Sequence, residues 1–285
     1  MNIDELVRLS FEARLAIIEK CQQLGGAHLG GCFSSIDFLI AYYHAIYVGL
    51  PASARNDFYE GRLAADTKLI TSKGHCYLAQ LAALDTVFQG EKYLGQYFQH
   101  GTNFFGHPKR NENNAHFLVS TGSLGQGVAF GNGLALGAQL RNIHQQVIIS
   151  LVGDGELQEG VTYEAINFSA HHRLNHWIVV DNNNQISLGK SSDILNIGRV
   201  SDRYQGLNIN AFKVDGHSFR ELKSVISKIN SPTTNSEIGG FVELNTVKGK
   251  GVSFMEGESK WHHRRFRDGE YEAALNELSG NKFHA

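Results

Sequence analysis

Two short apolar runs with a helical segment between them form the clearest pattern in this chain. The runs cover Val147–Val152 and Trp177–Val180, and both are too short for a lone helix. Between them, apolar residues recur at helical spacing from about Glu159 to His172. Uninterrupted apolar runs of this length are typical of strands buried in a parallel sheet. The stretch therefore predicts a β-α-β unit.

The rest of the chain repeats this alternation of strands and helices. A helix is expected at 3–23, and a second, opened by a Ser34-x-x-Asp37 capping box, follows a flexible glycine-rich loop at 26–31. Residues 50–67 are polar and predict no regular element. Further strands are expected at 68–71, 211–214 and 241–245, and further helices at about 77–87, 128–140, 219–229 and 271–278. This order predicts an α/β fold with a mostly parallel central sheet and helices on both faces.

Polar residues follow both strands of the central β-α-β unit. Asp154 lies between Gly153 and Gly155 after the first strand, and Asn184 follows the second, with the main-chain carbonyl of Ile186 two residues further on. Parallel strands end at the same sheet edge, where open α/β sheets bind ligands. Mg²⁺ prefers such oxygen ligands and completes its shell with phosphate and water. The pattern predicts a diphosphate held through a divalent ion. A capped turn and an Asn-rich loop are the structural alternative.

The overall composition sets limits on partners and location. The formal charge of −2 over 285 residues implies no general polyanion-binding surface, so nucleic acid is not an expected partner. Three cysteines without a C-x-x-C spacing argue against a disulfide scaffold or a zinc site. No apolar stretch reaches the length of a membrane-spanning helix, and the N-terminus reads as an amphipathic helix rather than a signal peptide. We therefore expect a soluble cytoplasmic protein that does not bind membranes.

Several short motifs resemble those of the transketolase family. GDGELQEG followed by DNNNQIS resembles its thiamine diphosphate motif, and SKGH, GHP, TGSLGQG and TVKGKG followed by WH resemble others. The resemblance covers nearly all of residues 1–265. It implies an enzyme that binds thiamine diphosphate and Mg²⁺, with Ca²⁺ or Mn²⁺ as possible substitutes. Such an enzyme transfers a two-carbon ketol unit from a ketose or ketose phosphate to an aldose.

The resemblance also implies a division of the enzyme between two chains. Residues 1–285 correspond to a single domain that binds the diphosphate and the metal. The family's pyrimidine-binding domain carries the glutamate that activates the cofactor. We expect that domain on a separate C-terminal-type transketolase subunit, most simply in an α₂β₂ assembly with active sites between chains.

Residue roles follow from the resemblance, motif by motif. His28 and His262 would act on the donor oxygens and transfer protons, and His107 would hold the donor hydroxyl. Histidines with pKa values near neutrality suit these tasks. The implied metal ligands are Asp154, Asn184 and Ile186. The implied cofactor-binding residues are His75, Ser123, Leu124, Gly125, Gly153, Asp154, Gly155, Glu159 and Asn184. Glu156 occupies a variable position of the motif and is not among them.

Some positions depart from the family pattern and leave the substrates open. Leu29 replaces the usual proline after the first histidine, and His263 replaces the glycine of W-H-G. The donor, the acceptor and the pathway therefore remain undetermined. One alternative is a thiamine-dependent synthase, or a 2-oxo acid dehydrogenase α-like subunit, that uses pyruvate or another oxo acid. A second alternative is a non-catalytic regulatory subunit.

Overall fold

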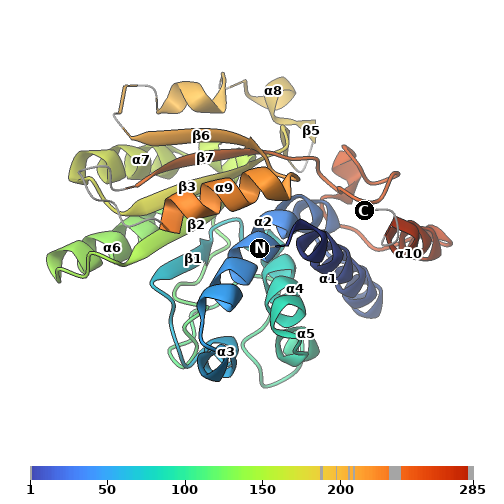
Figure 1. The fold of residues 1–285 in the computed structure, drawn as a ribbon. Helices are drawn as coiled ribbons and strands as arrows, with labels where there is room; N and C mark the ends of the chain where they lie inside the picture. Colours follow the sequence, from blue (N-terminus) through green and yellow to red (C-terminus); the bar gives the residue numbers. More distant parts are fainter. Residues whose placement is uncertain are drawn as a thin grey trace.

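The computed structural model describes residues 2–186, 189–196, 198–204, 206–207, 209–230 and 239–281. At its centre is a sheet of five parallel strands in the order β1-β2-β3-β7-β6 (Figure 1). Because these strands all run in the same direction, their carboxyl ends share one edge of the sheet. A separate antiparallel pair, β4 (Gln185–Ile186) and β5 (Gly189–Lys190), follows β3. The five strands are β1 (Thr67–Thr71), β2 (Val147–Gly153), β3 (His176–Asn182), β6 (Asn210–Asp215) and β7 (Gly240–Asn245).

Helices cover both faces of the sheet, as the sequence predicts. The α-helices are α1 (Ile3–Leu24), α2 (Leu29–Gly49), α3 (Ala52–Tyr59), α4 (Tyr77–Phe88), α5 (Lys92–Gln96), α6 (Gln126–Leu140), α7 (Gly160–His172), α8 (Ser191–Ile194), α9 (Phe219–Asn230) and α10 (Glu270–Asn281). Short 3₁₀ turns occur at η1 (Gly74–Cys76), η2 (Asp154–Gln158), η3 (Val200–Arg203) and η4 (Ser259–Trp261). Two of these turns, η1 and η2, lie at strand ends and shape the candidate site.

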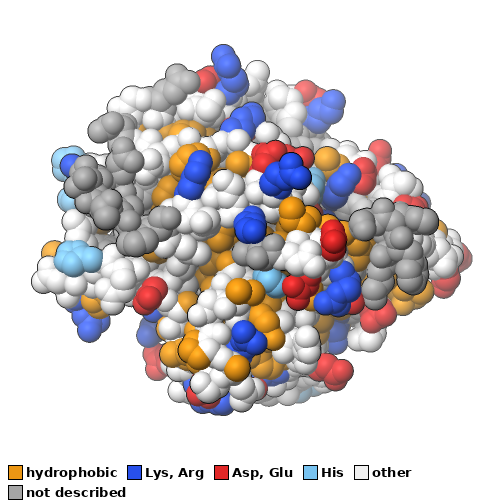
Figure 2. Space-filling model, viewed as in Figure 1, with side chains coloured by type: hydrophobic (Ala, Val, Ile, Leu, Met, Phe, Trp, Pro, Cys, Tyr) orange, Lys and Arg blue, Asp and Glu red, His pale blue; other side chains and the backbone are white. Residues whose placement is uncertain are grey.

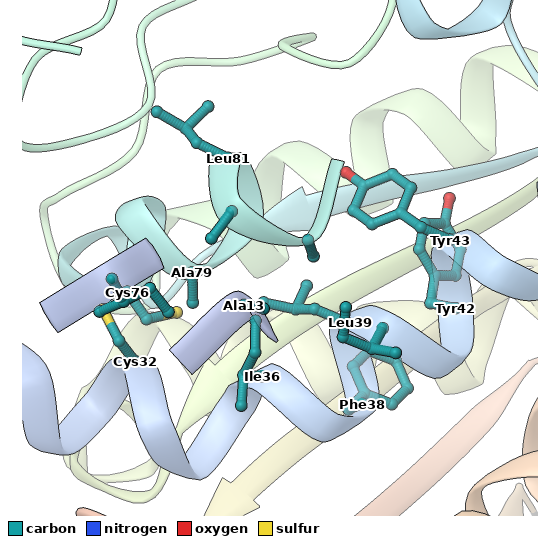
Figure 3. Close-up of a cluster of buried hydrophobic side chains, with 14 of the residues drawn as sticks. Ala13, Cys32, Ile36, Phe38, Leu39, Tyr42, Tyr43, Cys76, Ala79 and Leu81 are labelled. Atoms are coloured by element: carbon teal, nitrogen blue, oxygen red, sulfur yellow. The ribbon is translucent and has the colours of Figure 1, made fainter. Parts of the chain in front are cut away.

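Side chains alternate between two cores, one on each face of the sheet. Leu151 and Val179 join the large core formed with α1, α2, α4 and α9, whereas Val152 and Val180 join a smaller core with α6 and α7. Because neighbouring residues of a strand point to opposite faces, a continuous apolar run is needed to fill both cores. Figure 3 shows the large core where α1, α2 and α4 meet, with the labelled side chains of Ile36, Leu39 and Ala79 turned inward.

The second helix begins earlier than the capping-box pattern predicts. It starts at Leu29 and therefore includes Gly30 and Gly31, which the sequence predicts to lie in a flexible loop. A Cβ atom on Gly30 would come within 2.9 Å of the Trp261 carbonyl oxygen. Tertiary packing thus requires glycine here and outweighs its poor helix propensity. Ser34 is not a cap but a buried mid-helix residue whose hydroxyl oxygen lies 3.1 Å from the Gly31 carbonyl oxygen.

The segment at 50–67 also differs from its prediction. It contains α3, which follows Pro51 and buries Phe58 and Tyr59 near its end. Proline is favoured at the start of helices because its missing N–H has no helical partner there. Two aromatic residues at the carboxyl end thus anchor a short helix whose other residues are exposed or half-buried.

The surface carries both signs of charge. On the face drawn in Figure 2, Lys and Arg side chains are interspersed with Asp and Glu, in keeping with the small net charge of −2. Cys21, Cys32 and Cys76 are buried and not disulfide-bonded. Within the described ranges, no helix is long and apolar enough to cross a membrane.

Candidate active site

The Gly-Asp-Gly turn places a nearly buried carboxylate at the end of β2. Asp154 is 7% exposed, and its Oδ2 accepts hydrogen bonds from the Gln185 amide at 2.8 Å and from the Ser191 hydroxyl at 3.1 Å. Burial, assisted by the charge of Asp181, raises the pKa of Asp154 to about 6. The carboxylate therefore joins the end of β2 to β4 and α8, which follow β3. A nearby positive charge would stabilise its ionised form.

The oxygen atoms around Asp154 suit a hard cation. The side-chain oxygens Asn183 Oδ1 and Gln185 Oε1 are buried without a hydrogen-bond partner in the described structure. A Cβ atom on Gly155 would lie 2.9 Å from Cγ2 of Ile186, so glycine is required for the turn to approach this segment. Hard divalent ions take carboxylate, amide and main-chain oxygens. The residues present thus fit a divalent ion, with Asp154 and the Ile186 carbonyl as candidate ligands.

Asn184 lies on a different side of Asp154 from the cavity described next. Its side chain is exposed, and its Oδ1 accepts from the Ser192 amide at 3.1 Å. Together with Asp154 it lines a hollow of about 200 Å³. The neighbouring Asn183 faces the cavity instead. The assignment of Asn184 as a metal ligand therefore stays a prediction.

A cavity of about 140 Å³ opens at the carboxyl edge of the sheet. Residues from several separate motifs line it, which agrees with the expectation that strand ends converge there. Among the predicted site residues, the lining includes His75, Leu124, Gly153, Asp154, Gly155, Ile186 and His262. It also includes Lys73, Glu156, Asn183 and Lys248, which the motif analysis did not select.

The four predicted histidines form one cluster, with His28 at its centre. The ring of His28 lies 5.3 Å from His75, 6.2 Å from His107 and 5.4 Å from His262, measured between centroids. His263, which replaces a family glycine, adds a fifth ring 4.4 Å from His28. Residues separated by more than two hundred positions are thus brought together by α2, η1 and the segment after η4.

The histidine pKa values differ from the expectation of near neutrality. Burial, with repulsion from His263 and other cations, lowers the pKa of His28 to about 3. Burial and then Lys248 lower the pKa of His262 to about 4. Burial also lowers the pKa values of His75 and His107. At neutral pH these rings are uncharged, so each has one nitrogen that can accept a hydrogen bond and one that can donate.

A buried ion pair lies at the wall of the cavity. The ammonium group of Lys73 binds the carboxylate of Asp181, which also accepts from the hydroxyl groups of Ser34 and Ser35 at 2.6 Å and 2.7 Å. Lys73 comes from the turn after β1 and Asp181 from β3. The pair is almost fully buried, so breaking it would leave an uncompensated charge. It fixes the turn that carries His75.

Glu156 is the main positioning residue that sequence reasoning missed. Its carboxylate accepts from the Ser72 hydroxyl at 2.7 Å, the Gly125 amide at 2.9 Å and the Gly153 amide at 2.8 Å. These three donors belong to the SKGH, TGSLGQG and GDG motifs, so one side chain holds three motifs together. The local sequence of this turn gives no sign that Glu156 has such a role. Glu159, which the motif favoured, is exposed at the start of α7.

The TGSLGQG loop approaches the cavity through Leu124. That side chain is 41% exposed although it is apolar, while Ser123 is also exposed. Gly125 has a φ of 78°, and a Cβ atom there would lie 2.6 Å from the Thr162 hydroxyl. Glycine is therefore required for the loop to enter α6 beside α7.

Comparison with known proteins identifies the family. The family model described as "Transketolase, thiamine diphosphate binding domain" matches residues 11–283, and the chain belongs to this family. An apulose-4-phosphate transketolase subunit from Phocaeicola vulgatus is 26% identical, with 98% of this chain and 95% of that protein covered. The 6-deoxy-6-sulfo-D-fructose transketolase subunit SqwG from a Clostridium species is 29% identical over 93% of each.

Single-chain transketolases match over only part of their length. Human transketolase is 26% identical, and the match covers 87% of this chain but 38% of the human protein. The crystal structure of Campylobacter jejuni transketolase matches 98% of this chain with a TM-score of 0.79 and 24% identity, and the chain spans 43% of that protein. These comparisons confirm the family, the α/β fold class and the prediction of a transketolase subunit.

Proposed function

We propose that this chain is the diphosphate-binding subunit of a two-chain transketolase that moves a two-carbon ketol unit from a ketose to an aldose. The observation that carries the proposal is the convergence of His28, His75, His107 and His262 beside the cavity that Asp154 closes. Thiamine diphosphate, when bound, supplies the electron sink for cleavage of the carbon–carbon bond. Mg²⁺, with Asp154, Asn184 and Ile186 as its predicted ligands, would hold the diphosphate of the cofactor.

The uncharged histidines would supply the hydrogen-bonding groups that this chain must contribute to the reaction. Cleavage of a ketose requires a base for the donor hydroxyl and hydrogen-bond donors for the oxygen that becomes negative. His28 and His262 are partly buried, and their lowered pKa values keep both rings uncharged at neutral pH, with one nitrogen free to accept a hydrogen bond from the donor hydroxyl. His107 is more exposed and can hold a donor hydroxyl. His75 lies deeper and is suited to contact the cofactor phosphate.

A separate pyrimidine-domain subunit would complete the enzyme. Support comes from relatives that are named as transketolase subunits and match this chain along almost their whole length. Further support comes from the outer surface of α6 and α7, where Phe130 and Phe168 are 46% and 40% exposed. Large exposed aromatic side chains on neighbouring helices are typical of protein contacts. An α₂β₂ assembly is the simplest arrangement that uses this surface and the cavity.

Among possible substrates, ketoses and their phosphates are favoured over oxo acids. The relatives named above act, by their names, on a sugar phosphate and on a sulfonated sugar. For this chain, a ketose with an anionic end is therefore the first donor to test. Pyruvate turnover would instead favour the synthase or dehydrogenase alternative.

The test begins with the natural partner. The chain is recovered natively, the protein bound to it is identified by mass spectrometry, and the pair is assayed with Mg²⁺, thiamine diphosphate, ketose donors and pyruvate. The proposal expects a stoichiometric pyrimidine-domain partner and ketose-dependent transfer that Asp154→Asn abolishes. Activity that survives Asp154→Asn would reject the catalytic proposal. A correctly assembled pair without turnover of any donor would favour a regulatory subunit.

A further inference from the structure

His263 lies at the exposed end of the histidine cluster. Its ring centroid is 4.4 Å from that of His28, closer than any of the other three rings. The side chain is exposed, whereas His28 is half-buried and His75 and His262 line the cavity. Within the described part of the chain, no protein group hydrogen-bonds to the ring nitrogens of His263. Both nitrogens are therefore open to a ligand that extends outward from the cavity.

A short antiparallel bridge fixes the position of this histidine. Ala27 and Arg264 exchange both main-chain hydrogen bonds, each at 3.3 Å. In such a pairing the adjoining residues, His28 and His263, stand opposite each other with their side chains on the same face. Arg264 is held in turn by an ion pair with Glu270 at 2.7 Å. The close approach of the two rings thus follows from main-chain pairing and does not depend on a chance side-chain rotation.

The order of the rings determines which part of a substrate each can reach. The bond that breaks in a ketose must lie beside the cofactor, so the two transferred carbons would occupy the inner side, next to His28 and His262. The rest of the sugar would extend outward past His28 toward His263. That part carries hydroxyl groups on its carbons. A neutral imidazole offers one acceptor and one donor nitrogen, which suits a hydroxyl group.

We propose that His263 is a specificity-determining residue that hydrogen-bonds a hydroxyl group on the part of the donor ketose that is not transferred. This inference rests on the proposed function. The aldose acceptor occupies the same place as the aldose that leaves, because its addition is the reverse of the cleavage step. His263 therefore contacts both sugars at one point, away from the reacting carbons, and affects the choice of sugar without binding the cofactor.

The experiment uses the assembled pair with Mg²⁺ and thiamine diphosphate. It compares kcat/KM for the ketose that the wild type uses best with kcat/KM for hydroxypyruvate, which leaves only carbon dioxide and has no hydroxyl on its leaving part. His263→Gly removes the ring, while His263→Asn and His263→Gln retain an amide near the positions of Nδ1 and Nε2. His144→Ala, an exposed histidine before β2, is the control. Calorimetry measures the affinity of each variant for thiamine diphosphate.

His263→Gly is expected to lower kcat/KM for the ketose about 3- to 10-fold, as the loss of one hydrogen bond between uncharged groups does. The change should appear chiefly in KM, because the contact is made in the bound substrate as well as in the transition state. Turnover of hydroxypyruvate and affinity for thiamine diphosphate should stay as in the wild type. At least one of His263→Asn and His263→Gln should recover most of the ketose kcat/KM, and His144→Ala should change nothing.

The outcomes separate this inference from the proposed function. If the wild type transfers the ketol unit and His263→Gly uses the ketose as well as the wild type or better, His263 has no such role and the proposed function stands. Equal losses with the ketose and hydroxypyruvate, or a loss of thiamine diphosphate affinity, would show a structural effect and would also overturn the assignment. If the assembled wild type turns over neither donor, the proposed function fails and the role of His263 fails with it.

Discussion

His217 accepts a hydrogen bond from the main-chain amide of Val247 through Nε2 at 2.8 Å. Its other nitrogen, Nδ1, lies 2.7 Å from Oδ2 of Asp37 and donates to that carboxylate. Arg14 binds the two oxygens of the same carboxylate at 2.8 Å each. A line of contacts thus runs from α1 and α2 to the residue directly before Lys248. It ties the loop after β7 to the helices on one face of the sheet.

Replacing His217 by Ala tests whether this line positions the loop. The change leaves the Val247 amide without its acceptor and should lower the free energy of unfolding by about 1–3 kcal/mol. Because the next residue, Lys248, lines the cavity, affinity for pyrophosphate with Mg²⁺ should fall as well. Urea unfolding and calorimetry measure the two effects, with exposed His144→Ala as the control. Lower stability with unchanged pyrophosphate affinity would limit His217 to a structural role.

Asp37 should be far more important for stability than an exposed aspartate in a similar pair. Asp37→Ala leaves Arg14, which is 3% exposed, with an uncompensated charge, and we expect a loss of about 3–5 kcal/mol. Asp57→Ala removes an ion pair with Arg62, in which the two side chains are 57% and 56% exposed. We expect this variant to lose only about 0–1 kcal/mol of stability. Denaturant unfolding compares the two variants. Similar losses in both would contradict the contrast.

Glu156→Ala should loosen three motifs at once. The change removes the acceptor of the Ser72 hydroxyl and of the Gly125 and Gly153 amides, all of them buried. Each unsatisfied buried donor costs about 1–3 kcal/mol, so severe destabilisation and weak cofactor binding are expected. Glu156→Gln retains an acceptor oxygen and should be milder. Glu164→Ala, on the exposed side of α7, is the control. Normal binding by a folded Glu156→Ala protein would argue against this positioning role.

The glycines of α6 should respond to substitution in opposite ways. A Cβ atom on Gly131 would lie 2.5 Å from Nε2 of His176 and 2.8 Å from the Ser150 hydroxyl, so Gly131→Ala should destabilise by about 1–3 kcal/mol. A Cβ atom on Gly133 meets nothing within 4 Å. Gly133→Ala should therefore stabilise the isolated chain by up to about 1 kcal/mol.

Thermal unfolding of the isolated chain measures both glycine variants. Poor assembly of Gly133→Ala with its partner, despite normal or improved stability, would place Gly133 at a subunit contact. Equal destabilisation by the two changes would contradict the distinction between a packed and an open face of α6.

Two buried histidines should make the fold sensitive to acid. Burial lowers the pKa of His176 to about 3 and that of His116 to about 4. The unfolded chain therefore binds more protons than the folded chain below the ordinary pKa of about 6.5. Stability is fully present above that value and falls by about 1.4 kcal/mol per pH unit for each histidine, until the folded pKa values are reached.

Urea unfolding between pH 7.5 and pH 5 measures this slope. His176→Gln removes one of these titrating groups, while site histidines with lowered pKa values, such as His28 and His262, still contribute. Its stability should therefore depend less steeply on pH, even though its stability at pH 7.5 is lower. The Nδ1 atom of His176 donates to Asn132 Oδ1 at 2.8 Å, and loss of the ring explains the lower starting value. An unchanged slope in His176→Gln would show that other groups dominate the acid response.

Much of this protein could be predicted from short-range patterns. Apolar runs such as Val147–Val152 must fill cores on both sheet faces, and that requirement is visible in a few consecutive residues. Motif order was sufficient to predict the family and to select His28, His75, His107 and His262. In the fold, the rings of the last three lie within 6.2 Å of the His28 ring, measured between centroids. Helix ends were less certain, as the early start of α2 demonstrates.

Only the tertiary structure decided which residues support the site. Glu156 and Lys248 look like ordinary charged residues in the sequence, yet one joins three turns and the other is buried and lines the cavity. The lowered histidine pKa values likewise depend on burial and on charges from distant segments. Burial and through-space electrostatics arise from contacts between residues far apart in the chain. Local sequence patterns predict the secondary-structure elements and the residue types of the candidate site. The long-range contacts determine the charge state of its histidines and the geometry of the site.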